Sequence, residues 1–181
     1  PFLSKLFLKQ NNYFFISTYL PLKTELKLQI RLRQFPNLWA TQPSPVEIPS
    51  IKQRKWTLNL HGDQEFYKIV QDMIPMHIPT AYLEGYSVLK QAAKDLPWPK
   101  KPKSIFTCNA FSGDDLFKIW AANNIENGVP LIIGQHGGNY GMNKFLFSEY
   151  HQLRIADKWL SWGWHYKNRK NIIPIGILKS F

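Results

Sequence analysis

Residues 131–141 read L-I-I-G-Q-H-G-G-N-Y-G, and they constrain the fold more than any other stretch of the chain. Three branched apolar residues run into a turn that holds four glycines and one histidine, His136. A short apolar run bounded by turn residues is typical of a strand buried on both faces. Glycines after such a strand allow a tight turn and close approach of a ligand. Because open α/β sheets bind ligands at this edge, the loop is the first candidate for chemistry.

The pattern of strand and helix repeats on both sides of this loop. Strands are expected at residues 104–108, 130–134, 159–162 and 172–175, and helices near 112–127 and 148–156. Ser112 is expected to cap the first of these helices, with Asp114 and Asp115 favouring its positive end. Single helices between strands predict a doubly wound, Rossmann-like parallel sheet.

The first hundred residues are less regular. We expect a strand at 12–20 that Pro21 ends, a loop at 41–50, a helix at 62–74 broken by Pro75, and a helix at 81–95 capped by Thr80. Residues 23–35 fit both helical and strand spacing, so their structure is left open. The stiff, basic segment 97–103 (P-W-P-K-K-P-K) is the best internal boundary.

The net charge of +11 is unevenly distributed along the chain. Lys and Arg exceed acids by nine to two in residues 1–60 and by five to none in residues 158–181, whereas residues 61–157 carry nine against ten. The glycine loop is therefore in a nearly neutral segment, while a nucleic-acid-binding protein usually has its basic patch at its working surface. We expect no nucleic-acid partner. Anionic membranes, phosphorylated substrates and a merely solvated surface all remain compatible with the excess charge.

The number of cysteines and the hydropathy of the chain bear on its cellular compartment. Cys108 is the single cysteine, which excludes an intramolecular disulfide and favours a reducing, cytoplasmic setting. A run of about 18 apolar residues is absent from the sequence, so no spanning helix is expected. A metal site from His136, His151 and His165 follows no known ligand spacing, so neither metal nor cofactor is expected. The chain starts without methionine and stops after an expected strand, which indicates a piece of a longer protein.

Candidate site residues lie around the glycine loop. The imidazole of His136 suits a general base or, when protonated, a stabiliser of a phosphate leaving group. The amides of Gly137 and Gly138 suit phosphate oxygens, and Asn109 follows the preceding strand at the same sheet edge. The alternative for His136 is a ring hydrogen-bonded to the backbone of a tight turn. The loop matches neither the P-loop nor the G-x-G-x-x-G pattern, and no nucleophile elbow is present.

Two further groups of residues have both a functional and a structural interpretation. Glu149 and Asp157 lie on or just after the following helix, where they either support the site or face solvent. Trp162 and Trp164 flank Gly163, and their rings either stack on sugars or bases or pack into the core.

Several segments together resemble a known family. They are S-T-Y-L-P (17–21), I-P-T-A-Y-L-E-G-Y (78–86), P-W-P-K-K-P-K-S-I-F-T-C-N-A-F (97–111), G-Q-H-G-G-N-Y-G (134–141) and A-D-K-W-L-S-W-G-W (156–164). The family consists of transferases encoded in bacterial surface-polysaccharide (O-antigen type) gene clusters and was first named from a Leptospira protein. From about residue 13 onward, the chain is similar to it.

The resemblance implies a two-domain GT-B-type glycosyltransferase-like enzyme, similar in its loop to CDP-glycerol glycerophosphotransferases. Residues 1–97 would form part of an acceptor-side α/β region, and residues 98–181 would begin a donor-side Rossmann-like domain. The expected catalytic residues are His136 and Glu149, and the expected substrate-binding residues are Asn109, Gln135, Gly137, Gly138, Asn139, Tyr140, Gly141, Trp162 and Trp164. The implied partners are a nucleotide-activated donor and a glycan or lipid-linked acceptor. The implied location is the cytoplasm, with peripheral contact to the inner face of an anionic membrane. Family members extend beyond the glycine loop, so donor-binding residues are expected after Phe181.

Two other classes of function remain open at this point. One is a GT-B-type epimerase or hydrolase of nucleotide sugars, which would convert the donor without an acceptor. The other is a non-catalytic basic module, whose binding would be salt-sensitive and would tolerate loss of His136.

Overall fold

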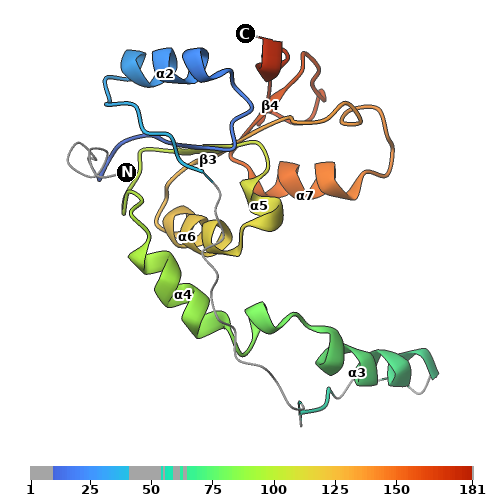
Figure 1. The fold of residues 1–181 in the computed structure, drawn as a ribbon. Coiled ribbons are helices and arrows are strands. Elements are labelled where there is room, and N and C mark those ends of the chain that lie inside the picture. Colours follow the sequence, from blue (N-terminus) through green and yellow to red (C-terminus); the bar gives the residue numbers. More distant parts are fainter. Residues whose placement is uncertain (1–9, 41–53, 55, 59–61, 63–64, 181) are drawn as a thin grey trace.

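A single parallel sheet organises the molecule (Figure 1). The computed structural model describes residues 10–40, 54, 56–58, 62 and 65–180, so the loop expected at 41–50 lies outside the described residues. Within this part of the chain the strands are β1 Phe14–Ile16, β2 Ile105–Thr107, β3 Leu131–Gly134, β4 Lys158–Ser161 and β5 Ile172–Pro174. Most of their apolar residues are buried, as in a sheet covered on both faces, and Ile173 of the last strand is exposed. The prediction of a Rossmann-like α/β fold is confirmed.

Helices cover both faces of this sheet. The helices of the described residues are α2 Leu22–Arg31, α3 Glu65–His77, α4 Tyr86–Asp95, α5 Ala110–Gly113, α6 Asp115–Glu126 and α7 Phe147–Ile155, with 3-10 turns η1 Thr80–Tyr82 and η2 Leu178–Ser180. Phe14 faces the larger core with α4, α6 and α7, whereas its neighbour Phe15 faces a smaller core with α2 and η2. Helix α3 lies apart from the sheet (Figure 1). The strand order follows the chain and does not reverse among the described strands, unlike the order of a doubly wound sheet.

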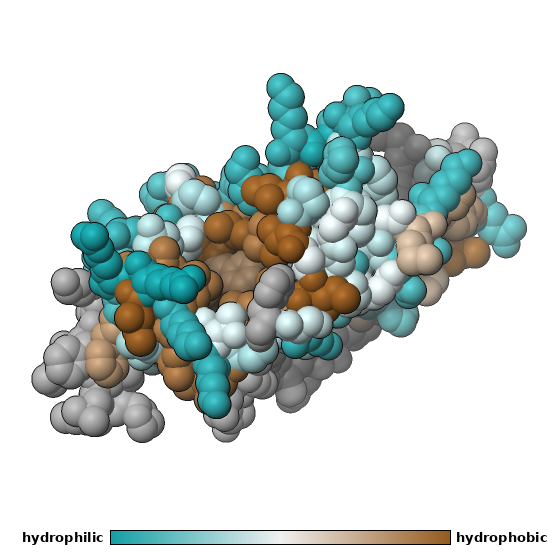
Figure 2. All heavy atoms as spheres, turned by 90° about the horizontal axis from the view of Figure 1, so that it is seen from above, coloured by the Kyte–Doolittle hydropathy of each residue, from teal (hydrophilic) through white to brown (hydrophobic). Residues whose placement is uncertain are grey.

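The face covered by α2 and η2 is only partly filled. Its buried core consists of Phe15, Phe106, Cys108 and Leu178, and Ile132 and Leu160 are only partly buried against it. Figure 2 shows the molecule from the side of α2 and the C-terminal end, with hydrophobic side chains gathered in a hollow between hydrophilic ones.

The strand register brings three loops to one edge of the sheet. Ile16 pairs with Thr107, and Thr107 pairs with Ile133, so the segments after β1, β2 and β3 all leave at the same level. At the end of β3, a Cβ on Gly134 would lie 2.6 Å from Leu178 and 2.7 Å from the sulfur of Cys108. Only glycine therefore allows the C-terminal turn η2 to pack here.

Local details differ from several expectations. Of the segment 23–35, whose structure was left open, residues up to Arg31 belong to helix α2, which begins directly after Pro21, and the rest is not helical. Thr80 caps no α-helix, because it begins η1 and α4 starts later, after Gly85. Ser112 is not a cap either, because it lies within α5. Asp114 caps α6 by accepting a 2.8 Å hydrogen bond from the Phe117 amide.

Pro75 does not break α3, which continues for two residues beyond the proline, to His77. β1 pairs with β2, so residues on both sides of the boundary expected at residue 97 share one sheet. The division into regions 1–97 and 98–181 stays a prediction, and it must accommodate this shared sheet.

Candidate functional site

Four side chains from separate segments meet beyond the carboxyl ends of the strands. The Asn109 amide donates a 2.9 Å hydrogen bond to the Tyr19 hydroxyl. The Tyr19 ring lies parallel to that of His136, with centroids 6.1 Å apart and 9° between the planes. The ammonium of Lys179 lies 4.5 Å from the centroid of the Tyr19 ring. We call these four residues, Tyr19, Asn109, His136 and Lys179, the edge cluster.

The backbone that presents Tyr19 is held in an uncommon conformation. Ser17 and Tyr19 have positive φ values of 49° and 57°. For non-glycine residues this region costs on the order of 1 kcal/mol or more per residue, and such residues concentrate at functional sites. Thr18 holds the turn by donating to the Glu25 carboxylate, and the amide and thiol of Cys108 donate to the Ser17 and Thr18 carbonyls. Burial raises the pKa of the Cys108 thiol to about 12, so this group acts as a neutral hydrogen-bond donor.

The ring of His136 is oriented by a chain of hydrogen bonds from the core. The indole N–H of Trp159 can only donate, so it fixes the Gln152 oxygen at 3.2 Å. The Gln152 amide nitrogen then donates to the Tyr140 hydroxyl at 2.7 Å. The hydroxyl proton of Tyr140 can then be donated to Nε2 of His136, which lies 3.3 Å from the hydroxyl oxygen. This arrangement favours the tautomer with an unprotonated Nε2.

His136 is held in its neutral form. Burial lowers the pKa of the imidazole below its ordinary value, the backbone of Cys108 opposes this shift, and the charge of Lys179 adds to it. Nδ1 is shielded from solvent and makes no hydrogen bond with any group in the described part of the chain. A neutral ring with a lone pair on Nε2 can accept a proton, which is what a general base requires.

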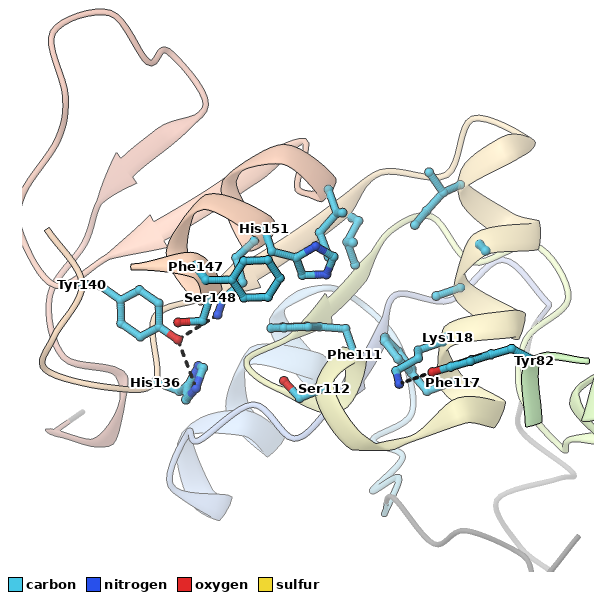
Figure 3. A pocket seen from close by; sticks show the side chains of 16 residues that line it. Tyr82, Phe111, Ser112, Phe117, Lys118, His136, Tyr140, Phe147, Ser148 and His151 are labelled. Carbon is cyan, nitrogen blue, oxygen red and sulfur yellow. Dashed lines mark hydrogen bonds between the residues drawn. The ribbon is translucent and has the colours of Figure 1, made fainter. Parts of the chain in front are cut away.

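A groove of about 630 Å³ begins at His136 and Tyr140 (Figure 3). It passes between α6 and α7, and its walls are largely apolar, with Ala121, Ala122, Ile125, Leu131 and Ile155 among the lining residues. His151 stacks on Phe147 at the rim, with ring centroids 6.4 Å apart. At the far end Lys118 donates to the Tyr82 hydroxyl and to Asp115. Polar groups thus lie at both ends of a largely apolar groove, and Ser112 and His151 lie between them (Figure 3).

The glycines after β3 have different roles. Gly138 is exposed and has open space where a Cβ would lie, and within the described residues the amides of Gly137 and Gly138 donate no hydrogen bond. Gly141 has a φ of +78°, and a Cβ there would lie 2.7 Å from the Trp164 ring. Gly137 and Gly138 therefore have backbone amides that can bind an anion, whereas position 141 requires glycine because of packing. Asn139, between them, is exposed.

Gln135 links this loop to the segment after β4. Its side-chain oxygen accepts hydrogen bonds from the Trp162 amide and the Trp164 indole, both at 2.9 Å. Its side-chain nitrogen donates to the Gly137 carbonyl at 2.7 Å, and Gln135 is only 2 % exposed. The Trp162 indole donates to the Gln135 carbonyl at 3.0 Å. The indole N–H groups of Trp162 and Trp164 therefore donate to Gln135. This arrangement matches the packing interpretation of the two tryptophans.

Glu149 anchors the end of the glycine loop. Its carboxylate accepts a 2.6 Å hydrogen bond from the Gly141 amide and a 2.8 Å hydrogen bond from the Tyr166 hydroxyl. The side chain of Glu149 is buried, and the hydrogen bond that Tyr166 donates to it raises the pKa of Tyr166. Glu149 therefore positions the loop, and none of its hydrogen bonds in the described part of the chain reaches the edge cluster. Asp157 is remote as well, because its carboxylate accepts from the Leu131 amide at the start of β3.

Sequence reasoning missed two members of the edge cluster. Tyr19 was included only within the S-T-Y-L-P segment, although its position after an expected strand was a usable signal. Lys179 gave no signal, because nothing local indicates that η2 returns to the sheet edge. In the described part of the chain, no group of three or more His, Cys, Asp or Glu could hold a metal ion. Among the same residues, no helix is long and apolar enough to cross a membrane.

Comparison with known proteins supplies the family. A model of the LIC12162 family transferases matches residues 1–181. No curated protein and no solved structure matches the chain. The matching family is the one, first named from a Leptospira protein, that the sequence segments resemble, and its name implies a donor and an acceptor substrate. On this match, the chain belongs to the LIC12162 family of transferases.

Proposed function

We propose that the protein transfers a sugar or polyol-phosphate group from a nucleotide-activated donor to an acceptor hydroxyl in bacterial surface-polysaccharide biosynthesis. The observation that carries this proposal is the position of His136, whose Nε2 lies where the groove meets the edge cluster and whose neutral form is favoured by burial. Transfer to a hydroxyl needs a base at the junction of two binding sites, one for each substrate. The family membership supports the transferase class.

The donor's phosphates would bind at the edge cluster. Free amides at Gly137 and Gly138, the Asn109 amide and the Lys179 ammonium are all suited to anionic oxygens. Tyr19 holds Asn109 by a hydrogen bond and Lys179 by a cation–π contact. A donor would exchange these contacts for stronger, charge-assisted ones. Exposed Asn139 is available to the same ligand.

The acceptor would lie in the groove, with its hydroxyl toward His136. The apolar walls between α6 and α7 suit the hydrophobic part of a lipid-linked acceptor better than a bare glycan. The 3.3 Å contact between Tyr140 and Nε2 is long for a hydrogen bond, so an acceptor hydroxyl can share or replace it at low cost. This arrangement favours transfer over isomerisation of the donor, which needs no second site.

The transfer step then follows from these positions. Nε2 of His136 takes the acceptor proton as the acceptor oxygen bonds to the transferred group. The bond from that group to the nucleotide phosphate breaks, and the electron pair stays on the departing phosphate. Lys179 and the glycine amides stabilise the charge that develops there. Glu149 and Gln135 keep the loop in place without touching the substrates.

Replacement of His136 by Gln in the full-length protein tests the proposal. Turnover with CDP-, UDP- or GDP-linked donors should fall by about 10²-fold or more, as expected when a general base is lost. Donor-induced thermal stabilisation should persist, because the phosphate contacts remain. The exposed His165 provides the matched control, and His165→Gln should leave turnover unchanged. Unchanged turnover in His136→Gln would refute the assignment, and donor conversion without acceptor would indicate an epimerase or hydrolase.

Lys179→Gln tests the donor site separately. This variant should weaken donor binding about 10-fold or more, since a hydrogen bond to a charged group contributes about 1.5–3 kcal/mol. Isothermal titration with the donor measures the change, and Lys167→Gln is the control on an exposed lysine after β4. Equal donor affinities in the two variants would remove Lys179 from the site.

A further inference from the structure

The segment after the glycine loop exposes large apolar side chains. Met142, Phe145 and Phe147 are 81 %, 88 % and 82 % exposed. The three side chains lie within six residues, in the connection that leads into α7 along the outer edge of the molecule (Figure 1). Single exposed apolar residues are ordinary, but a contiguous group of this kind indicates a contact surface.

The charges around this segment are almost all positive. Lys144 and Arg169 line the same 660 Å³ depression as Phe145, Phe147 and Tyr150. Arg154 lies over the Tyr150 ring and donates to its hydroxyl. The acid in this depression is Glu149, which is buried and already accepts two hydrogen bonds. The exposed charge beside the aromatic rings is therefore cationic.

We propose that this surface, Met142, Lys144, Phe145, Phe147 and Arg169, docks the protein on a bilayer that carries anionic lipids. Aromatic rings beside cationic side chains suit the interface between headgroups and acyl chains, where the rings are buried and the cations meet phosphates. Helix α3 offers a contrast, because its exposed Phe66 and Met76 share the helix with Glu65 and Asp72. The inference does not depend on the transfer chemistry. Phe147 also lines the groove, so docking would bring the groove mouth to the membrane surface.

Vesicle flotation with the full chain tests the proposal. The chain should bind phosphatidylglycerol-containing vesicles, bind pure phosphatidylcholine vesicles weakly, and release from the former as salt rises. Phe145→Ser with Phe147→Ser should lower the partition coefficient by about tenfold or more, because two buried rings are lost. Phe66→Ser is the matched control, since Phe66 is a 67 % exposed phenylalanine on α3, and should bind as the unmodified chain does.

Other outcomes decide against the surface. Equal binding by the double serine variant, or no preference for anionic vesicles, would overturn the proposal. Concentration-dependent dimers that the double variant abolishes, without vesicle binding, would assign the surface to a second copy of the chain. Should the double variant not fold, Lys144→Glu with Arg169→Glu asks the same question by charge reversal. His136→Gln should bind vesicles normally, so failure of the docking surface and failure of the proposed transfer remain distinguishable.

Discussion

The hydroxyl oxygen of Tyr140 lies 3.3 Å from Nε2 of His136, at the end of a chain of hydrogen bonds that starts at Trp159. Each donor in this chain is fixed by the group beneath it, because the indole can only donate. The tautomer of the imidazole at the sheet edge is therefore favoured by two residues of the buried core, Trp159 and Gln152. The proposed base depends on core packing as much as on its own loop.

Tyr140→Phe removes the donor to His136 and the acceptor for Gln152. Burial, the main cause of the lowered pKa of His136, remains in this variant, so the pKa should stay below its ordinary value and rise only by what the hydrogen bond from Tyr140 contributed. The free energy of unfolding should fall by about 1–3 kcal/mol, since the buried amide of Gln152 loses its acceptor. NMR titration and urea denaturation measure the two effects. Tyr150→Phe, at an exposed hydroxyl, should change stability by less than about 0.5 kcal/mol. An unchanged His136 titration in Tyr140→Phe would contradict the proposed tautomer.

His136 should make stability depend on pH in a definite direction. Burial lowers the pKa of the folded imidazole below the ordinary value of 6.5, so the unfolded chain binds the proton more readily. Stability should therefore be intact above that value and be lost as the pH falls below it. Urea denaturation from about pH 7.5 to about pH 5 should show a steeper loss for the unmodified chain than for His136→Gln. Parallel curves for the two proteins would show that His136 ionises equally in both states.

Gly141 and Gly138 should respond very differently to alanine. Gly141→Ala places a Cβ 2.7 Å from the Trp164 ring at a φ of +78°, so stability should fall by about 2–4 kcal/mol from strain and overpacking. Gly138→Ala meets open space and should change stability by less than about 0.5 kcal/mol. Thermal unfolding of both variants provides the comparison. Similar losses in the two would mean that the loop has another conformation.

The parts of the fold that local patterns determine were accessible from sequence. The strand 131–134 and its glycine turn were predicted because a buried strand needs an unbroken apolar run and a tight turn needs glycine. The capping of α6 was misassigned to Ser112, because the chain forms the short helix α5 before Asp114 and several residues in this stretch are chemically suitable caps. Local propensity indicates that a cap exists nearby but leaves its position to tertiary packing.

The candidate site was predictable only in part, because it is assembled from distant segments. His136 and Asn109 follow strands and so could be placed at the sheet edge from topology alone. Lys179 reaches the edge only through the return of η2 over Gly134, which no sequence spacing encodes. Gln135 was expected to line the site, but its amide bridges to Trp162 and Trp164. A polar residue next to a glycine loop has the same sequence pattern whether it binds a ligand or the chain itself.

Glu149→Gln separates a positioning role from the catalytic role that the resemblance implies. The carboxylate accepts from the Gly141 amide and from the Tyr166 hydroxyl, whereas a carboxamide has one acceptor oxygen for two donors. Stability should fall by about 1–3 kcal/mol. The pKa of Tyr166 should return toward its ordinary value, because the hydrogen bond that Tyr166 donates to the Glu149 carboxylate is the main cause of its rise. Ultraviolet titration of the tyrosines detects this shift, and Glu126→Gln, at an exposed carboxylate, should leave both readouts unchanged.

If Glu149 only positions the loop, turnover in Glu149→Gln should keep the pH profile of the unmodified enzyme at a reduced level. Loss of one limb of that profile, with the Tyr166 titration unaltered, would instead assign Glu149 to proton transfer.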